Sequence, residues 1–150
     1  MKPTTKIGSL LDQKGREVYA VAPGDTVYHA IAVMADKGVG ALLVMEGERL
    51  VGIISERDYT RKVILKGRSS REAHVEEIMT RDVVTGSPEM TIEEGMRLMT
   101  ERHIRHLPIL EEGRVAGMVS IGDLVKWIIA EQEETITHLA NYIGSGGYSR

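Results

Sequence analysis

The feature that most constrains the fold is an internal repeat, because the chain carries one pattern twice, 65 residues apart. Residues 23–64 align with residues 88–129 without a gap, and ten of these 42 positions are identical. Many other aligned pairs keep their apolar character, as Val44 and Ile109 do. Self-similarity at a fixed spacing indicates a structural unit built twice. We therefore expect two similar half-domains in one chain.

Each copy predicts the same order of elements, β-α-β-β-α, and hence an α+β fold. In the first copy apolar residues recur at helical spacing after Thr26, and Gly38 ends the pattern. In the second copy Thr91 and Glu94 form a capping box, which begins a helix. Two apolar runs around a polar, glycine-containing turn then predict a β-hairpin. A copy of about 60 residues buries too little surface alone, so we expect two pseudo-symmetric half-domains packed sheet to sheet.

Segments outside the repeat connect and extend it. We predict repeat 1 at residues 7–66, a linker at 67–77, repeat 2 at 78–130, and a C-terminal helix extension with a flexible tail at 131–150. The short amphipathic stretches "KIGSLLD" and "VEEIMT" resemble each other, so one is expected to introduce each half. The last helix carries an apolar stripe that consists of Leu124, Ile128, Ile136, Leu139 and Ile143.

Composition limits the function classes. The chain has 150 residues, no cysteine and a net charge of −3, which argues against disulfides, thiolate chemistry and general nucleic-acid binding. No apolar run approaches the roughly 18 residues that a membrane span needs. The first residues lack the apolar core of a signal peptide. We therefore expect a cytoplasmic protein with neither a membrane nor a nucleic acid as partner.

Glycine, serine and aspartate recur where each hairpin ends, in "GIISERD" and "GMVSIGD". Ser55 and Asp58 in the first copy correspond to Ser120 and Asp123 in the second. One interpretation is a helix cap, since a serine three residues before an acid is close to a capping box. The other is a ligand site, because a helix start offers free N–H groups to a phosphate and an aspartate can accept from a ribose diol.

Two details favour the ligand site. The acid is aspartate both times, whereas a capping box favours the longer glutamate or glutamine. Gly52 and Gly117 each lie in a strand, where glycine costs stability unless a backbone or a ligand comes close. The sequence therefore predicts two symmetric clefts that bind a phosphate-bearing or ribose-bearing ligand.

These residues resemble the tandem cystathionine-β-synthase (CBS) domain pair, or Bateman module, over roughly residues 7 to 130. The resemblance implies adenosine-nucleotide binding in clefts between the half-domains, with the aspartates on the ribose and the serines near ribose or phosphate. Basic residues entering the middle strand would meet phosphate, and the stretches before each first helix would line an adenine pocket. The nucleotide-binding residues that it implies are Ser55, Arg57, Asp58, Ser120, Asp123, Arg105, His106, Tyr19, Val21, Val84 and Thr85.

The two copies differ at the phosphate positions. The second copy has Arg105 and His106 where the first has Gly40 and Ala41. The two sites therefore cannot treat a phosphate alike, and the sequence leaves open which site the Arg–His pair serves. The family's ligands include AMP, ADP, ATP, S-adenosylmethionine and dinucleotides such as NAD(H), and the sequence does not choose among them.

Other polar features have competing explanations. His103 and His106 are three residues apart without further ligands at metal-binding spacing, so phosphate contact or a surface role is preferred to a metal. Pro108 cannot donate to a sheet, so its strand either starts there or turns that side to an edge. A basic run is either a solvated linker or a phosphate contact of a larger nucleotide, and it consists of Arg61, Lys62, Lys66, Arg68 and Arg71.

Taken together, the sequence predicts a regulatory protein that senses adenosine nucleotides and acts on an effector protein in trans. The clefts offer no evident nucleophile–base pair or metal cluster, so an enzyme is not expected. The resemblance also implies a homodimer paired through its helices. A structural dimerisation module with vestigial sites, or a small nucleotide-acting enzyme, remain the alternatives.

Overall fold

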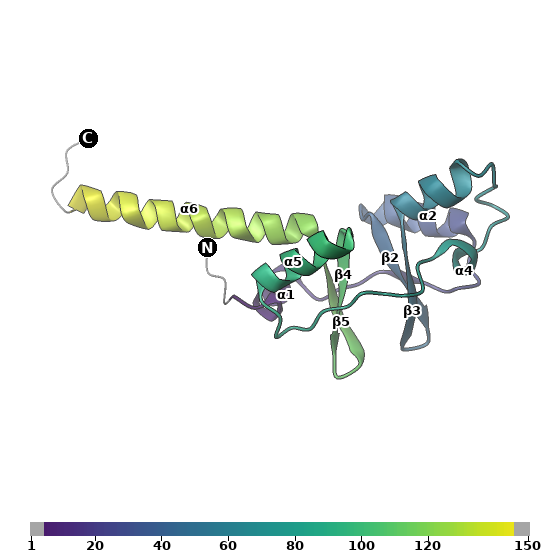
Figure 1. Ribbon diagram of the computed structural model, residues 1–150, viewed down its shortest axis with the longest axis horizontal. Coiled ribbons are helices and arrows are strands. Elements are labelled where there is room, and N and C mark those ends of the chain that lie inside the picture. Colours follow the sequence, from purple (N-terminus) through teal and green to yellow (C-terminus); the bar gives the residue numbers. More distant parts are fainter. Residues whose placement is uncertain (1–4, 146–150) are drawn as a thin grey trace.

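A computed structural model describes residues 5–145, which form two halves with separate hydrophobic cores (Figure 1). The repeat 1 elements are β1 (Ala20–Val21), α2 (Val27–Lys37), β2 (Ala41–Glu46), β3 (Arg49–Ser55), α3 (Glu56–Tyr59) and the π-helix η1 (Thr60–Ile64). The repeat 2 elements are α5 (Ile92–Arg102), β4 (His106–Glu111), β5 (Arg114–Ser120) and α6 (Ile121–Ser145). Two further helices precede these sets, namely α1 (Ile7–Lys14) and α4 (Val75–Ile78).

The helices α2 and α5 begin at the capping residues that the sequence predicted, and α2 ends at the predicted glycine. The Thr26 hydroxyl accepts from the backbone N–H of His29 at 3.1 Å and caps α2. Thr91 and Glu94 form the complete capping box of α5. Gly38 ends α2 in the left-handed conformation, with φ of 66°, which glycine adopts without steric cost. These predictions are confirmed.

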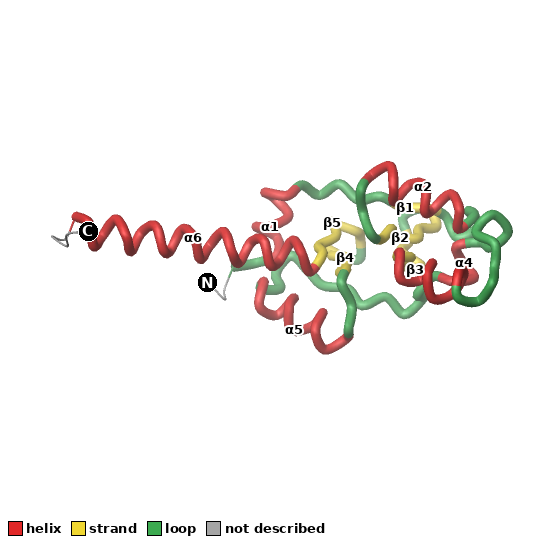
Figure 2. Tube along the Cα trace, turned by 90° about the horizontal axis from the view of Figure 1, so that it is seen from above, coloured by secondary structure: helices red, strands yellow, loops and turns green. Residues whose placement is uncertain are grey.

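The two halves place their hairpins next to each other in the centre of the molecule, with helices on the outside (Figures 1 and 2). Helix α6 begins at the end of β5 and projects away from both halves (Figure 1). Leu124 of the predicted stripe is fully buried and Ile128 packs against the same core. The side chains of Ile136, Leu139 and Ile143, and the tail at 146–150, lie outside the described residues.

The first strand of the repeat forms only in the first half. There β1 pairs parallel with β2, and the Leu43 N–H donates to the Tyr19 carbonyl at 3.1 Å. In the second half the counterpart is a single bridge between Gly86 and Ile109. Pro108 stands in the position of Leu43 and has no N–H to donate. The expected second short strand is therefore reduced to a single bridge. Pro108 lies on the edge of β4 where that strand would have paired, and it has no N–H there to donate.

The introductory helices are exchanged between the halves. Helix α1 lies within the range 7–66 expected for repeat 1, yet its buried side chains Ile7, Leu10 and Leu11 belong to the core of the second half. Helix α4 packs in the core of the first half instead. The backbone contacts are symmetric, since Ile7 N–H donates to Met90 O and Val75 N–H donates to Asp25 O, both at 2.8 Å. The second half thus includes α1, which precedes the first half in the chain, and the first half includes α4, which precedes the second.

This exchange explains the two strand glycines. A Cβ atom at Gly52 would lie 2.5 Å from the sulfur of Met79, and one at Gly117 would lie 2.9 Å from a methyl group of Leu11. Both distances are below any ordinary carbon contact, so a side chain at either position would force Met79 or Leu11 to shift, whereas glycine leaves room for them. Of the two reasons given for a glycine in a strand, a close backbone or a ligand, the structure shows close packing, by Met79 and the Thr80 carbonyl at Gly52 and by Leu11 at Gly117.

Candidate functional site

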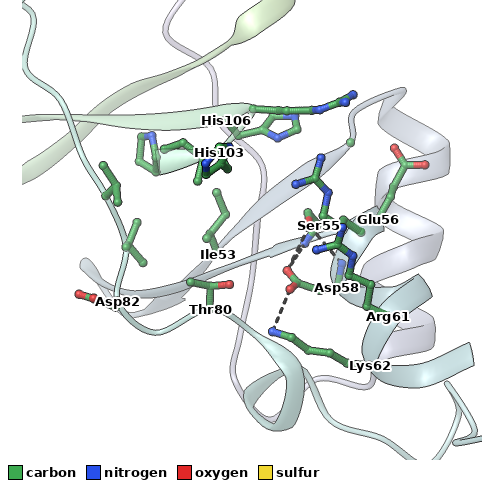
Figure 3. Close-up of a pocket in the computed structure, with 17 residues that line it drawn as sticks. Ile53, Ser55, Glu56, Asp58, Arg61, Lys62, Thr80, Asp82, His103 and His106 are labelled. Atoms are coloured by element: carbon green, nitrogen blue, oxygen red, sulfur yellow. Dashed lines mark hydrogen bonds and ion pairs between the residues drawn. The ribbon is translucent and has the colours of Figure 1, made fainter. Parts of the chain in front are cut away.

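A cavity of about 500 Å³ opens between the two halves (Figure 3). Its walls come from residues within 53–62 at the end of β3, within 80–84 before α5, and within 103–108 at the start of β4. Gly40, just before β2, completes the lining. We call this cavity the Asp58 cleft.

Ser55 and Asp58 occupy the start of α3 and form a reciprocal capping box. The Asp58 carboxylate accepts from the Ser55 backbone N–H at 2.9 Å and from the Ser55 hydroxyl at 3.1 Å. Lys62, four residues on, donates to the other Asp58 oxygen at 2.9 Å (Figure 3). The Asp58 side chain is 12% exposed and lines the cleft. Asp58 therefore combines a structural role with access to a ligand.

The choice of aspartate does not separate the two interpretations. Both serine–aspartate pairs close the box, since the Ser120 backbone N–H donates to Asp123 at 2.8 Å just as Ser55 does to Asp58. A capping box needs an acceptor that can reach the N-cap N–H, and aspartate reaches it here. The inference that aspartate argues against capping was wrong.

Arg105 and His106 both line the Asp58 cleft, although they belong to the second repeat. The cavity that the Arg–His pair lines is thus the one that contains Asp58. The strand β4 starts at His106 and crosses toward the end of β3, so its first residues reach the first copy's Asp58. One cleft thus receives a carboxylate from one half and basic side chains from the other.

The environment of His106 keeps its imidazole neutral near pH 7. Burial is the largest cause and lowers the pKa of His106 below its ordinary value of 6.5. The carboxylate of Asp123 opposes this shift, while the ammonium of Lys14 adds to it. A neutral imidazole can donate from one ring nitrogen and accept at the other. An anion bound beside it would favour the charged form.

Three guanidinium groups line the cleft: those of Arg57, Arg61 and Arg105. Among the described residues, none of the three forms a hydrogen bond or an ion pair. Lys62 adds a fourth cation, which is held by Asp58 and by the Ile78 carbonyl. Unpaired guanidinium groups around one cavity match the geometry and charge of a phosphate.

The hydrogen bonds of Ser55 show how its hydroxyl is used in the cleft. The Ser55 hydroxyl is bonded to Asp58, and within residues 5–145 neither His103 nor His106 hydrogen-bonds to it. A serine nucleophile needs a general base within hydrogen-bond reach. No group of three or more potential metal ligands occurs among the described residues. The cleft is lined by three carboxylates, those of Glu56, Asp58 and Asp82, and by the cations of Arg57, Arg61, Lys62 and Arg105.

The counterpart position around Asp123 is arranged differently. Lys14, at the end of α1, donates to the Asp123 carboxylate at 2.6 Å and to the Met118 carbonyl at 2.7 Å. Burial of Asp123 raises its pKa, but the bonds from Lys14 and from the Ser120 N–H outweigh this and hold the pKa below its ordinary 3.8. Asp123 is therefore an ion-paired carboxylate.

Not every predicted residue reaches the Asp58 cleft. Val84 lines it, whereas Thr85 does not belong to its lining. Val21 is 6% exposed and lies in the first core, with Tyr19 packed against it. From the basic run, Arg61 and Lys62 line the cleft. Lys66, Arg68 and Arg71 do not belong to its lining; Arg68 pairs with Glu77, and Arg71 lies over the Tyr28 ring at 4.3 Å.

Sequence reasoning missed Lys14, Thr80 and Asp82. The last two line the cleft from the segment after α4, and Lys14 bonds to Asp123. The similarity of the introductory stretches could have indicated them. Aligning these stretches pairs Leu11 with Met79, and three residues further on it pairs Lys14 with Asp82. No helix within the described residues is long and apolar enough to cross a membrane.

The fold is a pair of half-domains with a cavity between them. The family model described as "CBS domain" matches twice, at residues 14–64 and 75–130. The chain therefore belongs to the CBS domain family, and the two matches confirm the tandem pair, or Bateman module, that the repeat indicated.

Individual relatives agree with this assignment. The chain is 40% identical over 154 residues to the "CBS domain-containing protein CBSX3, mitochondrial" of Arabidopsis thaliana, which covers 97% of this chain and 74% of that protein. A solved structure from Burkholderia ambifaria, of a protein with CBS domains, is 50% identical, with a TM-score of 0.83. The match covers 85% of this chain and 96% of that chain. The CBS domain pair of protein MJ0100, solved in complex with 5-methylthioadenosine and S-adenosylmethionine, shares the fold. It is 22% identical with a TM-score of 0.76, and the match covers 86% of this chain and 99% of that chain.

Proposed function

We propose that this chain is a regulatory protein that binds an adenosine-containing nucleotide in the Asp58 cleft and signals energy or redox state to an effector protein in trans. The observation that carries this proposal is the composition of the cleft, where Asp58 from one half and Arg105 and His106 from the other line one cavity. A carboxylate accepts from a ribose diol, and guanidinium groups donate to phosphate oxygens. AMP, ADP, ATP and NAD(H) all carry both groups.

The ligands of a protein with the same fold support the adenosine class. 5-Methylthioadenosine and S-adenosylmethionine, named for the MJ0100 domain pair, both contain adenosine. Neither carries a phosphate, whereas three unpaired guanidinium groups line the cleft of the present chain. We therefore favour a phosphate-bearing nucleotide here over S-adenosylmethionine.

The test is a thermal-shift panel with AMP, ADP, ATP, NAD, NADH, S-adenosylmethionine and adenosine, followed by titration calorimetry. We expect Asp58→Ala to weaken the best ligand about tenfold or more, because charge-assisted hydrogen bonds contribute about 1.5–3 kcal/mol. Asp58→Asn is the sharper variant, since its amide oxygen can still cap α3 while the charge is lost. Asp36→Ala, at an exposed position of α2, is the control.

The outcomes separate the alternatives. Binding that Asp58→Ala leaves unchanged would reduce the serine–aspartate pair to a helix cap. No affinity for any compound of the panel would favour a structural dimerisation module with vestigial sites. Conversion of a bound nucleotide to a product would favour a small enzyme.

We further propose that the chain forms a homodimer through its helices. Large apolar side chains are exposed on helical segments, namely Tyr28 on α2, Ile64 and Leu65 at the end of η1, and Val125 and Ile129 on α6. Exposed apolar groups on a pseudo-symmetric surface favour a self-complementary contact. Light scattering at micromolar concentration should give twice the chain mass of 16.6 kDa, and a monomer would contradict the proposal.

A further inference from the structure

Helix α6 extends beyond the half to which it belongs. Its first residues pack on the second core, where Leu124 is fully buried and Ile128 lies against it. Glu131 still contacts this half, because it accepts from the Thr5 hydroxyl at 3.3 Å. The helix then continues to Ser145 and projects away from both halves in both views (Figures 1 and 2). An isolated helix shorter than about 12–15 residues is marginal in water, so the projecting part gains stability from a packing partner.

A second face of α6 is apolar and exposed. Val125 is 41% exposed and Ile129 is 49% exposed, although both side chains are large and apolar. At about 100° of rotation per residue, Val125 lies about 100° and Ile129 about 140° from Leu124 around the helix axis. The two side chains therefore lie on a flank of α6, beside the face that covers the second core.

The spacing along this flank is that of a coiled coil. Starting at Val125, alternating steps of four and three residues give the d and a positions of a heptad. Isoleucine at a with leucine at d favours two parallel strands. The pattern therefore indicates that one further helix packs on this flank. We call these positions the α6 seam; its a positions are Ile129, Ile136 and Ile143, and its d positions are Val125, Gln132 and Leu139.

The first half exposes the same repeat position, but its helix ends there. Ile64, the repeat counterpart of Ile129, is 52% exposed. The π-helix η1 ends at Ile64, and the chain then turns at Gly67, where φ is 68°. In the second half α6 instead continues past Ile129 to Ser145. A symmetric contact along the seam therefore brings the second halves of two copies together.

We propose that two copies of this chain pair along the α6 seam as a parallel, in-register coiled coil, which places their second halves side by side. This inference rests on the proposed homodimer and assigns its contact and its orientation. A second copy fits because it presents the same pattern of seam positions, and a twofold axis lets each position meet its own equivalent. It also covers Val125 and Ile129, which are exposed in the single chain.

Gln132 distinguishes the two orientations of such a pair. In a parallel, in-register pair it meets Gln132 of the partner subunit, and each side-chain amide can donate to and accept from the other. In an antiparallel pair with the same overlap, Ile129 would meet the partner's Leu139, and Gln132 would meet the partner's Ile136. The amide of Gln132 would then be buried without a hydrogen-bond partner, which is costly. A single polar residue in a seam specifies register in this way.

The experiment uses introduced thiols, because the chain has no cysteine of its own. Ile129→Cys and Leu139→Cys, each alone in the full chain and mildly oxidised with diamide, should each form a disulfide-linked dimer. In a parallel, in-register pair every seam position meets its own equivalent, so the two thiols lie close enough to bond. Glu134→Cys, at an exposed position on the opposite side of α6 from the seam, is the matched control and should stay unlinked on a denaturing gel.

A charge in the seam gives a second test. Adding Ile129→Glu to Leu139→Cys brings two carboxylates together in an apolar contact, which is unfavourable, and should abolish the cross-link at position 139. Because Ile129 is exposed in the single chain, this substitution should leave both halves folded. Adding Glu134→Gln instead should leave the cross-link intact. A cross-link that survives Ile129→Glu would show that the helix ends meet without the seam and would overturn the inference.

Light scattering of the unsubstituted chain separates a failure of this inference from a failure of the homodimer. A dimeric parent whose Ile129→Cys and Leu139→Cys variants both stay unlinked would keep the homodimer and overturn the α6 contact. A cross-link that forms only when the two variants are mixed would mean an antiparallel pair, which also overturns the inference. A monomeric parent would contradict both proposals.

Discussion

The imidazole of His106 lies against Gly40, so that a Cβ atom at Gly40 would be 3.5 Å from both Cε1 and Nε2 of the ring. His106 begins β4 in the second half, and Gly40 precedes β2 in the first. Gly40 is itself the repeat counterpart of Arg105. The first copy therefore has no side chain at the position where the second has the guanidinium of Arg105, and the ring of His106 lies beside the Gly40 backbone.

This burial makes stability depend on pH. The pKa of His106 is lowered in the folded protein, mainly by burial, and is about 6.5 in the unfolded chain. Below that value the unfolded chain binds a proton that the folded chain does not, so the free energy of unfolding falls as pH falls toward the folded pKa. Urea unfolding of the parent and of His106→Gln, at about pH 7.5 and about pH 5.5, should show a smaller loss in the variant.

His29→Gln, at an exposed position of α2, provides the control for the general effect of losing a histidine. It should keep the parent's dependence on pH. An identical dependence in His106→Gln and in the parent would mean that His106 does not remain neutral when folded.

Arg105 should discriminate nucleotides from nucleosides. Its guanidinium lines the Asp58 cleft without a hydrogen bond or ion pair among the described residues, and it matches a phosphate in charge and shape. We expect Arg105→Ala to weaken AMP about tenfold or more, in line with the loss of a charge-assisted hydrogen bond, and to leave adenosine nearly unchanged. Calorimetry measures both, with Arg102→Ala at the end of α5 as the control. Equal losses for AMP and adenosine would make Arg105 a structural residue.

Gly52 should not tolerate even one methyl group. A Cβ atom there would lie 3.0 Å from the Thr80 carbonyl oxygen as well as close to Met79, and that backbone is held by its paired bonds with Ile53. Overpacking of a core costs about 1–3 kcal/mol, so Gly52→Ala should lower the free energy of unfolding by that amount. Gly24→Ala, which meets nothing within 4 Å, should be nearly neutral in the same urea titration.

Leu11 should stabilise the second half, although the first half is the one that comes directly after it in the chain. Its side chain is fully buried in the second core, and replacing a buried leucine by alanine costs about 2–5 kcal/mol. Hydrogen exchange of Leu11→Ala should show the larger loss of protection in β4, β5 and α5. Met79→Ala is the counterpart and should affect β2 and β3 more. Greater exchange in β2 and β3 of the Leu11 variant would contradict the exchanged arrangement of α1 and α4.

Local patterns in the sequence predicted local structure well. The helix caps at Thr26 and Thr91, the helix end at Gly38 and the glycine-containing hairpins all formed as expected. Each depends on hydrogen bonds and backbone conformations within a few residues, which the neighbouring residue types control. The 65-residue repeat also indicated the two halves before any contact was known, because both copies carry the same local signals.

Only the tertiary structure decided how these parts combine. Three features depend on contacts between residues far apart in the chain: the close packing at Gly52 and Gly117, the cavity that Arg105 lines, and the pairing of Lys14 with Asp123. A repeat makes two halves alike, but the crossing segments α1 and α4 differ in length and charge, and they meet equivalent surfaces with unequal side chains. The sequence by itself therefore determined two similar half-domains with two similar helix starts. The tertiary structure pairs Asp58, which lines the cavity between the halves, with Lys62 of its own segment, and Asp123 with Lys14 of the crossing helix α1.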